Sequence, residues 1–303
     1  ADTYSAQHRG GRGIIGMGTK DEDFIENVIA VNSHSYLLMF TNTGKVQAKK
    51  AYYIPEAGRT AKGQNLVNIL DLEEGEKITA CISVDAFDDE HYLTMVTRRG
   101  VIKRTPLKEY EYQRKGGKIA LNLDEGDELL FVRCTTGDCE LLIATRNGQA
   151  VRFHEENARV MGRTARGVRG ISLREGDEVV GVAVIEEGKD LLCVTENGFG
   201  KRSPFEDFRL MAHRGGYGVT CYNITDKSGA LTGVSAVDDN DDLMLITDGG
   251  TIIRTPVAGI PTRSRSAGGV IIMKMGEGQK IANFTKVAHA EEVAEEEGNS
   301  EEE

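Results

Sequence analysis

The sequence predicts an all-β fold, a six-bladed, propeller-like ring in which each blade holds about four antiparallel strands. A strand–turn–strand motif recurs five times and a glycine-rich motif recurs six times. No apolar pattern keeps the 3.6-residue period of a helix for long enough to form a substantial one. The 303 residues include 36 glycines but only five prolines and no tryptophan, which is typical of short strands joined by tight turns.

The first motif reads apolar-apolar-x-Thr-x-x-Gly-x-x-x-basic and predicts a β-hairpin. Turns such as Arg-Asn-Gly and Asp-Gly-Gly favour hairpins because they need a positive φ that Asn and Gly tolerate. The threonines of successive copies are 56, 48, 50 and 52 residues apart. The five copies are MFTNTGKVQAK (39–49), MVTRRGVIKRTP (95–106), IATRNGQAVRF (143–153), CVTENGFGKRSP (193–204) and LITDGGTIIRTP (245–256).

The second motif is rich in glycine and basic residues and alternates with the first. An apolar strand, an acidic turn such as DEGDE (124–128) and an alternating strand such as ITACISV (78–84) follow it. Each repeat alone exposes an apolar face, so neighbouring repeats must stack to form a core. The six copies are HRGGRGI (8–14), GRTAKGQ (58–64), QRKGGKI (113–119), GRTARGV (162–168), HRGGYGV (213–219) and SRSAGGV (264–270).

The count of glycine-rich segments predicts six blades within a domain at 1–287. The last half-repeat has no hairpin after it, so we expect its missing strands to come from residues upstream of Ala1. The expected blades are approximately 7–57, 58–112, 113–161, 162–212, 213–263 and an incomplete 264–287, followed by an acidic tail at 288–303.

The net charge of −11 conceals an uneven distribution. Residues 291–303 contain eight glutamates and no base, so the remaining chain carries 37 basic against 40 acidic residues. Like charges at this density cannot build a core, and we expect the tail to be disordered. Two roles stay open for it: keeping the domain soluble, or competing with a polyanion for the basic surface.

The basic residues are concentrated in particular segments of each repeat. The glycine-rich segments and the returning hairpin strands hold 25 of the 37 bases and no acid. Equivalent positions of a radial array share one rim, so this pattern predicts a positive band, the electrostatic signature of polyanion binding. Aromatic residues are not interleaved with the basic ones, which favours duplex backbone contacts over stacking on single strands. The sequence therefore predicts binding of double-stranded DNA.

Other functional classes find little support. The five cysteines are scattered without C-x-x-C spacing, which argues against a disulfide scaffold or a zinc site and fits a reducing cytosol. Asp238, Asp239, Asp241 and Asp242 lack the twelve-residue EF-hand pattern, and no P-loop is present. No apolar run approaches the ~20 residues of a membrane span. We expect no catalytic residue, metal or cofactor in this chain.

The segment Gln-His-Arg-Gly-Gly-Arg-Gly at 7–13 resembles the Gln-Arg-Arg-Gly-Gly-Lys-Gly box of the bacterial DNA gyrase A-chain family. His8 stands where that box has Arg, and Arg12 where it has Lys. The resemblance to the C-terminal domain of that family covers nearly all of 7–287, through the segments 21–40, 101–110, 165–180, 197–204 and 243–256.

This resemblance implies a six-bladed β-pinwheel whose blades exchange strands and whose rim bends DNA into a positive crossover. It implies a part in ATP-dependent negative supercoiling by an A2B2 type II topoisomerase in the bacterial cytoplasm, on the chromosome. The catalytic tyrosine lies elsewhere in the gyrase A polypeptide and the ATP site in the gyrase B polypeptide, so ATP and Mg²⁺ would act outside this chain. We expect the isolated domain to be a monomer, with duplex DNA, gyrase B and the rest of gyrase A as partners.

The expected DNA-binding residues come from the box and from the basic segments of each repeat. They are Gln7, His8, Arg9, Gly10, Gly11, Arg12, Gly13, Lys45, Lys49, Arg59, Lys62, Lys103, Arg104, Arg114, Lys115, Lys118, Arg152, Arg163, Arg166, Arg169, Lys201, Arg202, Arg214, Arg254, Arg263 and Arg265. Two alternatives stay open. A topoisomerase IV-type domain would share the blades but lack the box, and a propeller scaffold for proteins would not explain the acid-free basic segments.

Overall fold

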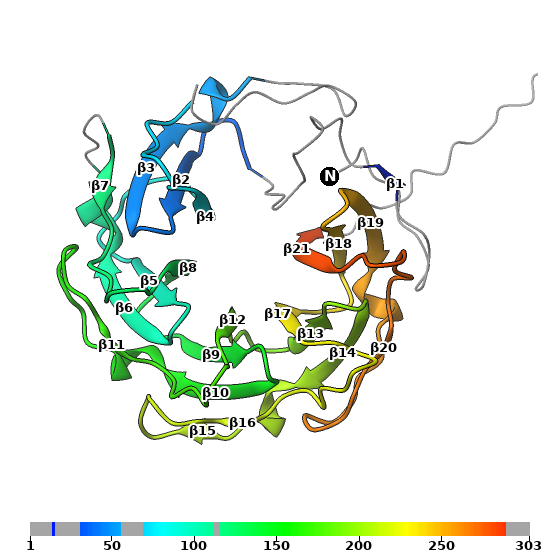
Figure 1. Cartoon of the computed structure of the whole chain (residues 1–303). Coiled ribbons are helices and arrows are strands. Elements are labelled where there is room, and N and C mark those ends of the chain that lie inside the picture. The colour runs from blue at the N-terminus through cyan, green and yellow to red at the C-terminus, as the bar shows by residue number, and fades with distance from the viewer. Residues whose placement is uncertain (1–13, 16–30, 56–68, 112–115, 289–303) are drawn as a thin grey trace, which may run out of the picture.

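The structure, a computed structural model, describes residues 14–15, 31–55, 69–111 and 116–288. This part of the chain forms five β-sheets and short 3-10 helices, and contains no α-helix. The sheets follow one another around a central axis like the blades of a propeller (Figure 1). The expected all-β, propeller-like fold is therefore confirmed, with five sheets in the described residues where six blades were expected.

Each sheet is built on one of the five predicted hairpins, and each hairpin has the expected antiparallel pairing. The hairpins are β2 (Tyr36–Thr41) with β3 (Lys45–Lys50), β5 (Tyr92–Thr97) with β6 (Val101–Pro106), β9 (Glu140–Thr145) with β10 (Gln149–His154), β13 (Asp190–Thr195) with β14 (Phe199–Pro204), and β18 (Asp241–Thr247) with β19 (Thr251–Pro256).

The recurring threonine and glycine of the motif close the hairpin turn. The buried hydroxyl of Thr41 accepts a hydrogen bond from the N–H of Lys45 at 3.2 Å, and each later copy repeats this contact. The turn glycine has a positive φ, 81° at Gly148, where an added Cβ would lie 2.5 Å from the carbonyl oxygen of Tyr222. Any larger residue would strain the backbone and collide with the neighbouring segment.

The innermost strand of each sheet pairs with the first strand of the hairpin. Together these strands surround the central axis (Figure 1). They are β4 (Ile78–Val84), β8 (Leu129–Thr135), β12 (Val179–Val184), β17 (Leu231–Val237) and β21 (Ile281–Ala288).

The outermost strand of each sheet is exchanged between repeats, as a pinwheel requires. It comes from the glycine-rich segment that follows the next hairpin in the sequence. For example, β7 (Lys118–Ile119) follows the β5–β6 hairpin but pairs with β3 of the hairpin before it. In the same way, β11 (Val168–Arg169) pairs with β6, β16 (Val219–Thr220) with β10 and β20 (Val270–Ile271) with β14. The third sheet gains a further strand, β15 (Leu210–Met211), parallel to β10.

The exchange changes the expected strand assignment at both ends of the chain. The last sheet takes its outermost strand, β1 (Ile14–Ile15), from the first glycine-rich segment, antiparallel to β19. The stretch 264–287 is not an incomplete blade, because it supplies β20 to the sheet of β13 and β14 and β21 to the sheet of β18 and β19. Five of the six glycine-rich segments thus supply the outermost strands of the five sheets, and the segment 58–64 lies outside the described residues.

The hydrophobic core lies between neighbouring sheets. Leu38 and Phe40 of β2 share one cluster with Leu93 and Met95 of β5 and with Leu129 of β8, all fully buried. Burying an aliphatic or phenyl side chain of this size contributes about 1.5–3 kcal/mol. Both faces of a blade are thus covered, and its outer edge is left for other contacts. No helix in the described residues is long and apolar enough to span a membrane.

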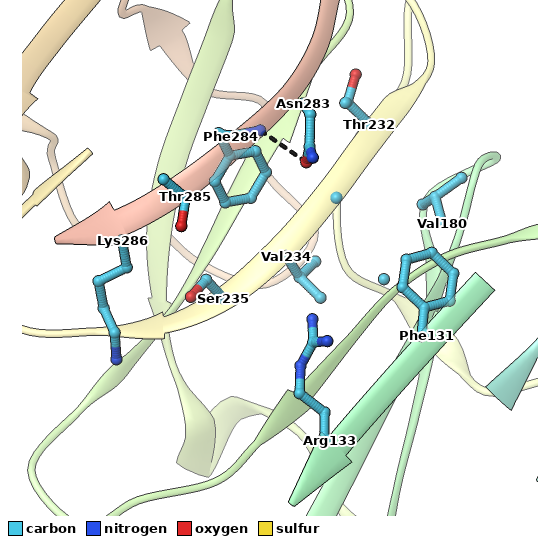
Figure 2. A pocket seen from close by; sticks show the side chains of 12 residues that line it. Phe131, Arg133, Val180, Thr232, Val234, Ser235, Asn283, Phe284, Thr285 and Lys286 are labelled. Carbon is cyan, nitrogen blue, oxygen red and sulfur yellow. Dashed lines mark hydrogen bonds between the residues drawn. The ribbon is translucent and has the colours of Figure 1, made fainter. Parts of the chain in front are cut away.

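A hollow of about 300 Å³ lies nearer the axis, where the innermost strands of four sheets, β8, β12, β17 and β21, meet (Figure 2). Phe131 and Arg133 of β8, Val234 of β17 and Phe284 of β21 contribute to its lining. Burial lowers the pKa of the Arg133 guanidinium. Among the described residues, no carboxylate lines this hollow.

Candidate nucleic-acid interface

The glycine-rich segments that the structure describes in full, 162–168, 213–219 and 264–270, lie along the outer edge of the ring (Figure 1). One of them leaves the edge of β6 at Val160, which bridges Arg104, and returns at Val168, opposite Ile102. The loop between them, 161–167, therefore arches over Lys103. At Gly167, φ is 97° and an added Cβ would lie 2.5 Å from the carbonyl oxygen of Ile102, so only glycine lets the loop lie this close to the sheet.

Eleven of the predicted basic residues in the described part of the chain are exposed or half-buried; Arg152 and Arg202 contact the next blade, and the other nine lie along these edges. Arg166, Arg169 and Arg263 are exposed, and the side chain of Arg166 is 71% accessible. The half-buried ones are Lys45, Lys49, Lys118, Arg163, Arg214 and Arg265.

Three of these arginines occupy equivalent positions of successive glycine-rich segments and make the same contact. Each donates from Nη1 to a carbonyl oxygen in the outermost strand of the preceding sheet. The contacts are Arg163 to Ile119 at 2.7 Å, Arg214 to Arg169 at 2.7 Å and Arg265 to Thr220 at 2.6 Å. A guanidinium has five N–H donors, so other donors are left for an anion while the side chain is held on the rim.

Exposed acids accompany some of the cations. The ammonium of Lys45 lies 2.6 Å from Glu73, and this hydrogen bond raises the pKa of Lys45. Arg166 pairs with Asp124 at 3.3 Å. Exposed pairs of this kind contribute only about 0–1 kcal/mol, so a DNA phosphate can replace the carboxylate at little cost.

The four predicted arginines on the returning hairpin strands all make contacts within or between blades. Three of them donate from the guanidinium to a carbonyl oxygen at the 3-10 helix of the next blade, η4 (Glu155–Asn157), η5 (Phe205–Asp207) or η6 (Val257–Gly259). These bonds join Arg104 to Ala158 at 2.9 Å, Arg152 to Phe208 at 3.0 Å and Arg202 to Ile260 at 2.9 Å, and each arginine also contacts a carboxylate, of Glu155, Glu140 or Asp239. Arg254, the fourth, is buried against Asp242 at 2.8 Å.

The two lysines on these strands are also buried rather than free. Lys103 and Lys201 are both 0% exposed. Burial lowers the pKa of both ammonium groups, that of Lys103 to about 7. The prediction that these two side chains bind DNA directly is therefore wrong, because a strand covered on both faces leaves no route from the side chain to solvent.

Sequence reasoning missed two exposed arginines, Arg159 and Arg209. Arg159 directly precedes Val160, which bridges Arg104 at the outer edge of one sheet. Arg209 directly precedes Leu210, which pairs with Arg152 at the outer edge of the next sheet. Their separation of 50 residues matches the repeat, and this spacing is the signal that could have identified them.

The other predicted residues lie outside the described part of the chain. They are Gln7, His8, Arg9, Gly10, Gly11, Arg12, Gly13, Arg59, Lys62, Arg114 and Lys115. In the sequence, the box at 7–13 directly precedes β1. In the described residues, no group of three or more His, Cys, Asp or Glu side chains is placed to hold a metal ion.

Comparison with known proteins identifies the family. The sequence model of the DNA gyrase C-terminal domain, a β-propeller, matches residues 1–32, 35–85, 91–136, 140–186, 189–238 and 241–288. The chain belongs to this family. The resemblance to the gyrase A C-terminal domain is thereby confirmed, and five of the six matched segments each contain one of the hairpins.

Relatives and solved structures agree with this assignment. The DNA gyrase A polypeptide of Clostridium acetobutylicum is 50% identical over 314 residues, covering 100% of this chain and 38% of the relative. That of Halalkalibacterium halodurans is 50% identical over 301 residues, covering 99% of this chain and 36% of the relative. The chain thus spans less than two fifths of the length of these curated relatives.

Among solved structures, a DNA gyrase A C-terminal domain superposes with a TM-score of 0.85 at 27% identity, covering 94% of this chain and 93% of that one. A C-terminal domain of DNA topoisomerase IV gives a TM-score of 0.75 at 28% identity, covering 89% of this chain and 84% of that one. The gyrase domain is the better match of these two.

Proposed function

We propose that this gyrase A-type domain binds duplex DNA along its rim, without sequence preference, and wraps the duplex around itself. The observation that carries the proposal is the repeated placement of Arg163, Arg214 and Arg265 on the outer edges of successive sheets, beside the exposed Arg166, Arg169 and Arg263. Contacts that recur with each repeat suit a backbone with a regular series of phosphates rather than a particular base sequence.

Curvature of the rim supports wrapping over simple binding. Successive edges face outward in different directions around the axis (Figure 1). A duplex that reaches several of them must bend, and smooth bending of a 20–30 bp site by 40–90° costs about 1–6 kcal/mol. Phosphate contacts on each edge offset this cost, and their number determines how far around the ring the duplex stays bound.

In the whole enzyme, the wrapped segment would be presented to the cleavage site of the gyrase complex as a positive crossover. Strand passage driven by ATP would then introduce negative supercoils. This chain would supply the geometry of the DNA, while an A2B2 assembly in the bacterial cytoplasm would supply cleavage, ATP hydrolysis and Mg²⁺.

The first test is a mobility-shift titration with random-sequence duplexes over a series of salt concentrations. About six to ten phosphate contacts predict a slope of log K against log salt between about −5 and −9. Equal affinity for unrelated sequences is expected. A slope shallower than about −3, or a strong preference for one sequence, would contradict the proposal.

A topoisomerase IV-type function is the second candidate, because the domain of that enzyme shares the fold at a TM-score of 0.75. The box at 7–13 favours gyrase, since it marks gyrase in the resemblance. The full enzyme distinguishes the two: gyrase introduces negative supercoils into a relaxed plasmid with ATP, and a topoisomerase IV does not.

A further inference from the structure

Two buried lysines hold the glycine-rich loops of the β5–β6 and β13–β14 sheets from the inside. The Nζ of Lys103 donates to the carbonyl oxygen of Ala120 at 2.6 Å and to that of Arg163. The Nζ of Lys201 donates to the carbonyl oxygens of Ser264 and Arg265 at 2.7 and 2.8 Å. Lys201 is thus bound by two carbonyls of the loop that covers it, whereas Lys103 is bound by one carbonyl of the loop 161–167 and by that of Ala120, which follows β7.

The peptide geometry of these loops gives the contacts a consequence for the surface. In a trans peptide the carbonyl and the following N–H point in opposite directions, and the described residues contain no cis peptide bond. When the carbonyl of Ser264 turns inward to Lys201, the N–H of Arg265 turns outward. The carboxylate of Asp207 already accepts from this N–H at 3.3 Å, so an anion can reach it.

The equivalent position of the other sheets lacks this ammonium. Gln47, Val151 and Ile253 take the place of the lysine in β3, β10 and β19, and all three are buried. Gln47 donates from Nε2 to the carbonyl oxygen of Asp71 at 2.7 Å, which shows that an uncharged amide is tolerated there as a donor. Two of the five described sheets therefore hold the glycine-rich loop through a buried lysine.

We propose that Lys103 and Lys201 are positioning residues for DNA phosphates. By drawing loop carbonyls inward, each lysine turns the amides and arginines of its own loop outward and fixes them for a phosphodiester. The β5–β6 and β13–β14 sheets then hold the duplex at defined points, and the sheets between them follow its path more loosely. This inference rests on the proposed DNA-binding function and adds to it which blades fix the duplex.

The test compares the double variants Lys103→Met/Lys201→Met and Lys103→Gln/Lys201→Gln with the unchanged chain and with Arg166→Ala. Duplex binding is measured by mobility shift over a salt series, and contacts are mapped by hydroxyl-radical footprinting. The methionine variant should bind about three- to tenfold more weakly, through lost loop order, with an unchanged salt slope. The glutamine variant keeps a donor and should recover most of the affinity. Arg166→Ala, which removes a surface cation, should reduce the slope by about one.

Methionine variants with unchanged affinity and footprint would overturn the inference. A slope reduced by about one per lysine in both double variants would instead show direct phosphate contact. Circular dichroism checks folding, and if the methionine variant is unfolded, the glutamine variant and its footprint decide. If the unchanged chain fails to bind duplex, the proposed function itself is wrong; if it binds and the variants match it, only this inference is wrong.

Discussion

The ion pairs formed by basic residues of the rim are of two kinds, buried and exposed. The side chain of Arg104 is 6% exposed and contacts the fully buried Glu155, whereas the side chain of Arg166 is 71% exposed and pairs with the half-exposed Asp124. The first arrangement keeps two charges out of water and joins two blades. The second is surrounded by solvent and can exchange its partner for a phosphate. Stability and DNA affinity should therefore depend on different arginines.

Arg104→Met should destabilise the domain strongly. The change leaves the carboxylate of Glu155 buried without its cation, although Thr135 and the N–H of Cys139 still donate to it. Removing one partner of a buried ion pair lowers the free energy of unfolding by about 3–5 kcal/mol. Because two donors to Glu155 remain, we expect a loss near the lower value. Urea unfolding measures the loss. Arg166→Ala is the control and should stay within about 0.5 kcal/mol; comparable losses in the two variants would contradict this division.

Lys103 should make stability depend on pH. Burial lowers the pKa of its ammonium from 10.5 to about 7, so between these values the unfolded chain binds more protons than the folded one. The free energy of unfolding contributed by this group therefore rises with pH from about 7 upward and is level below that. Comparing unfolding of the unchanged chain and of Lys103→Met at pH 7 and 8.5 isolates the effect. Parallel pH profiles would show that the pKa of Lys103 is not lowered.

At the scale of elements, the glycine-rich segment has to combine a close approach to the sheet with an exposed surface. Gly167 is in the left-handed region and almost touches Ile102, while Gly162, at the other end of the same loop, has nothing within 4 Å of an added Cβ. Glycine is therefore needed at one position and only tolerated at the other.

Gly167→Ala should cost about 1–3 kcal/mol through backbone strain and collision, and should displace the loop that carries Arg163 and Arg166. We expect a lower melting temperature together with weaker duplex binding. Gly162→Ala is the matched control and should change neither beyond about 0.5 kcal/mol. Equal behaviour of the two variants would mean that the loop is not held against β6 as described.

The hairpins could be predicted from the sequence because their signals are local. Thr41 and Gly44 lie in the turn that they close, so their spacing alone indicates the structure. The partner of β7 could not be predicted, because an outermost strand pairs with a hairpin from the preceding repeat and two-residue strands carry no pattern. For the same reason the sequence could not separate Lys103 from Arg166. Both lie in basic runs, and only the stacking of blades shows which one is covered.

At the scale of the whole molecule, the ring distributes its DNA contacts over many edges. Losing one edge should therefore affect the length of the wrapped segment more than the affinity. The box at 7–13 leads into β1 at the edge of the last sheet, so it would hold one end of the bent duplex. A stretch freed at one end can straighten, because bending stores energy along it.

The double variant Arg9→Ala/Arg12→Ala in the full gyrase should lose ATP-dependent supercoiling and keep ATP-independent relaxation. Binding of duplex by the isolated domain should weaken only modestly, since most rim cations are unchanged. Supercoiling and relaxation assays on one enzyme preparation, with a mobility shift on the domain, measure all three quantities. Undiminished supercoiling would show that the box is not needed to hold the wrapped end.

Wrapping of DNA around this domain can be measured directly by the linking number of a closed circular plasmid. A nicked plasmid is ligated in the presence of increasing amounts of the domain, the protein is removed, and the topoisomers are resolved. We predict a positive shift of the linking number that grows with the amount of bound domain and disappears in high salt, as the phosphate contacts are screened. Saturated binding of the plasmid with no shift in its linking number would contradict it.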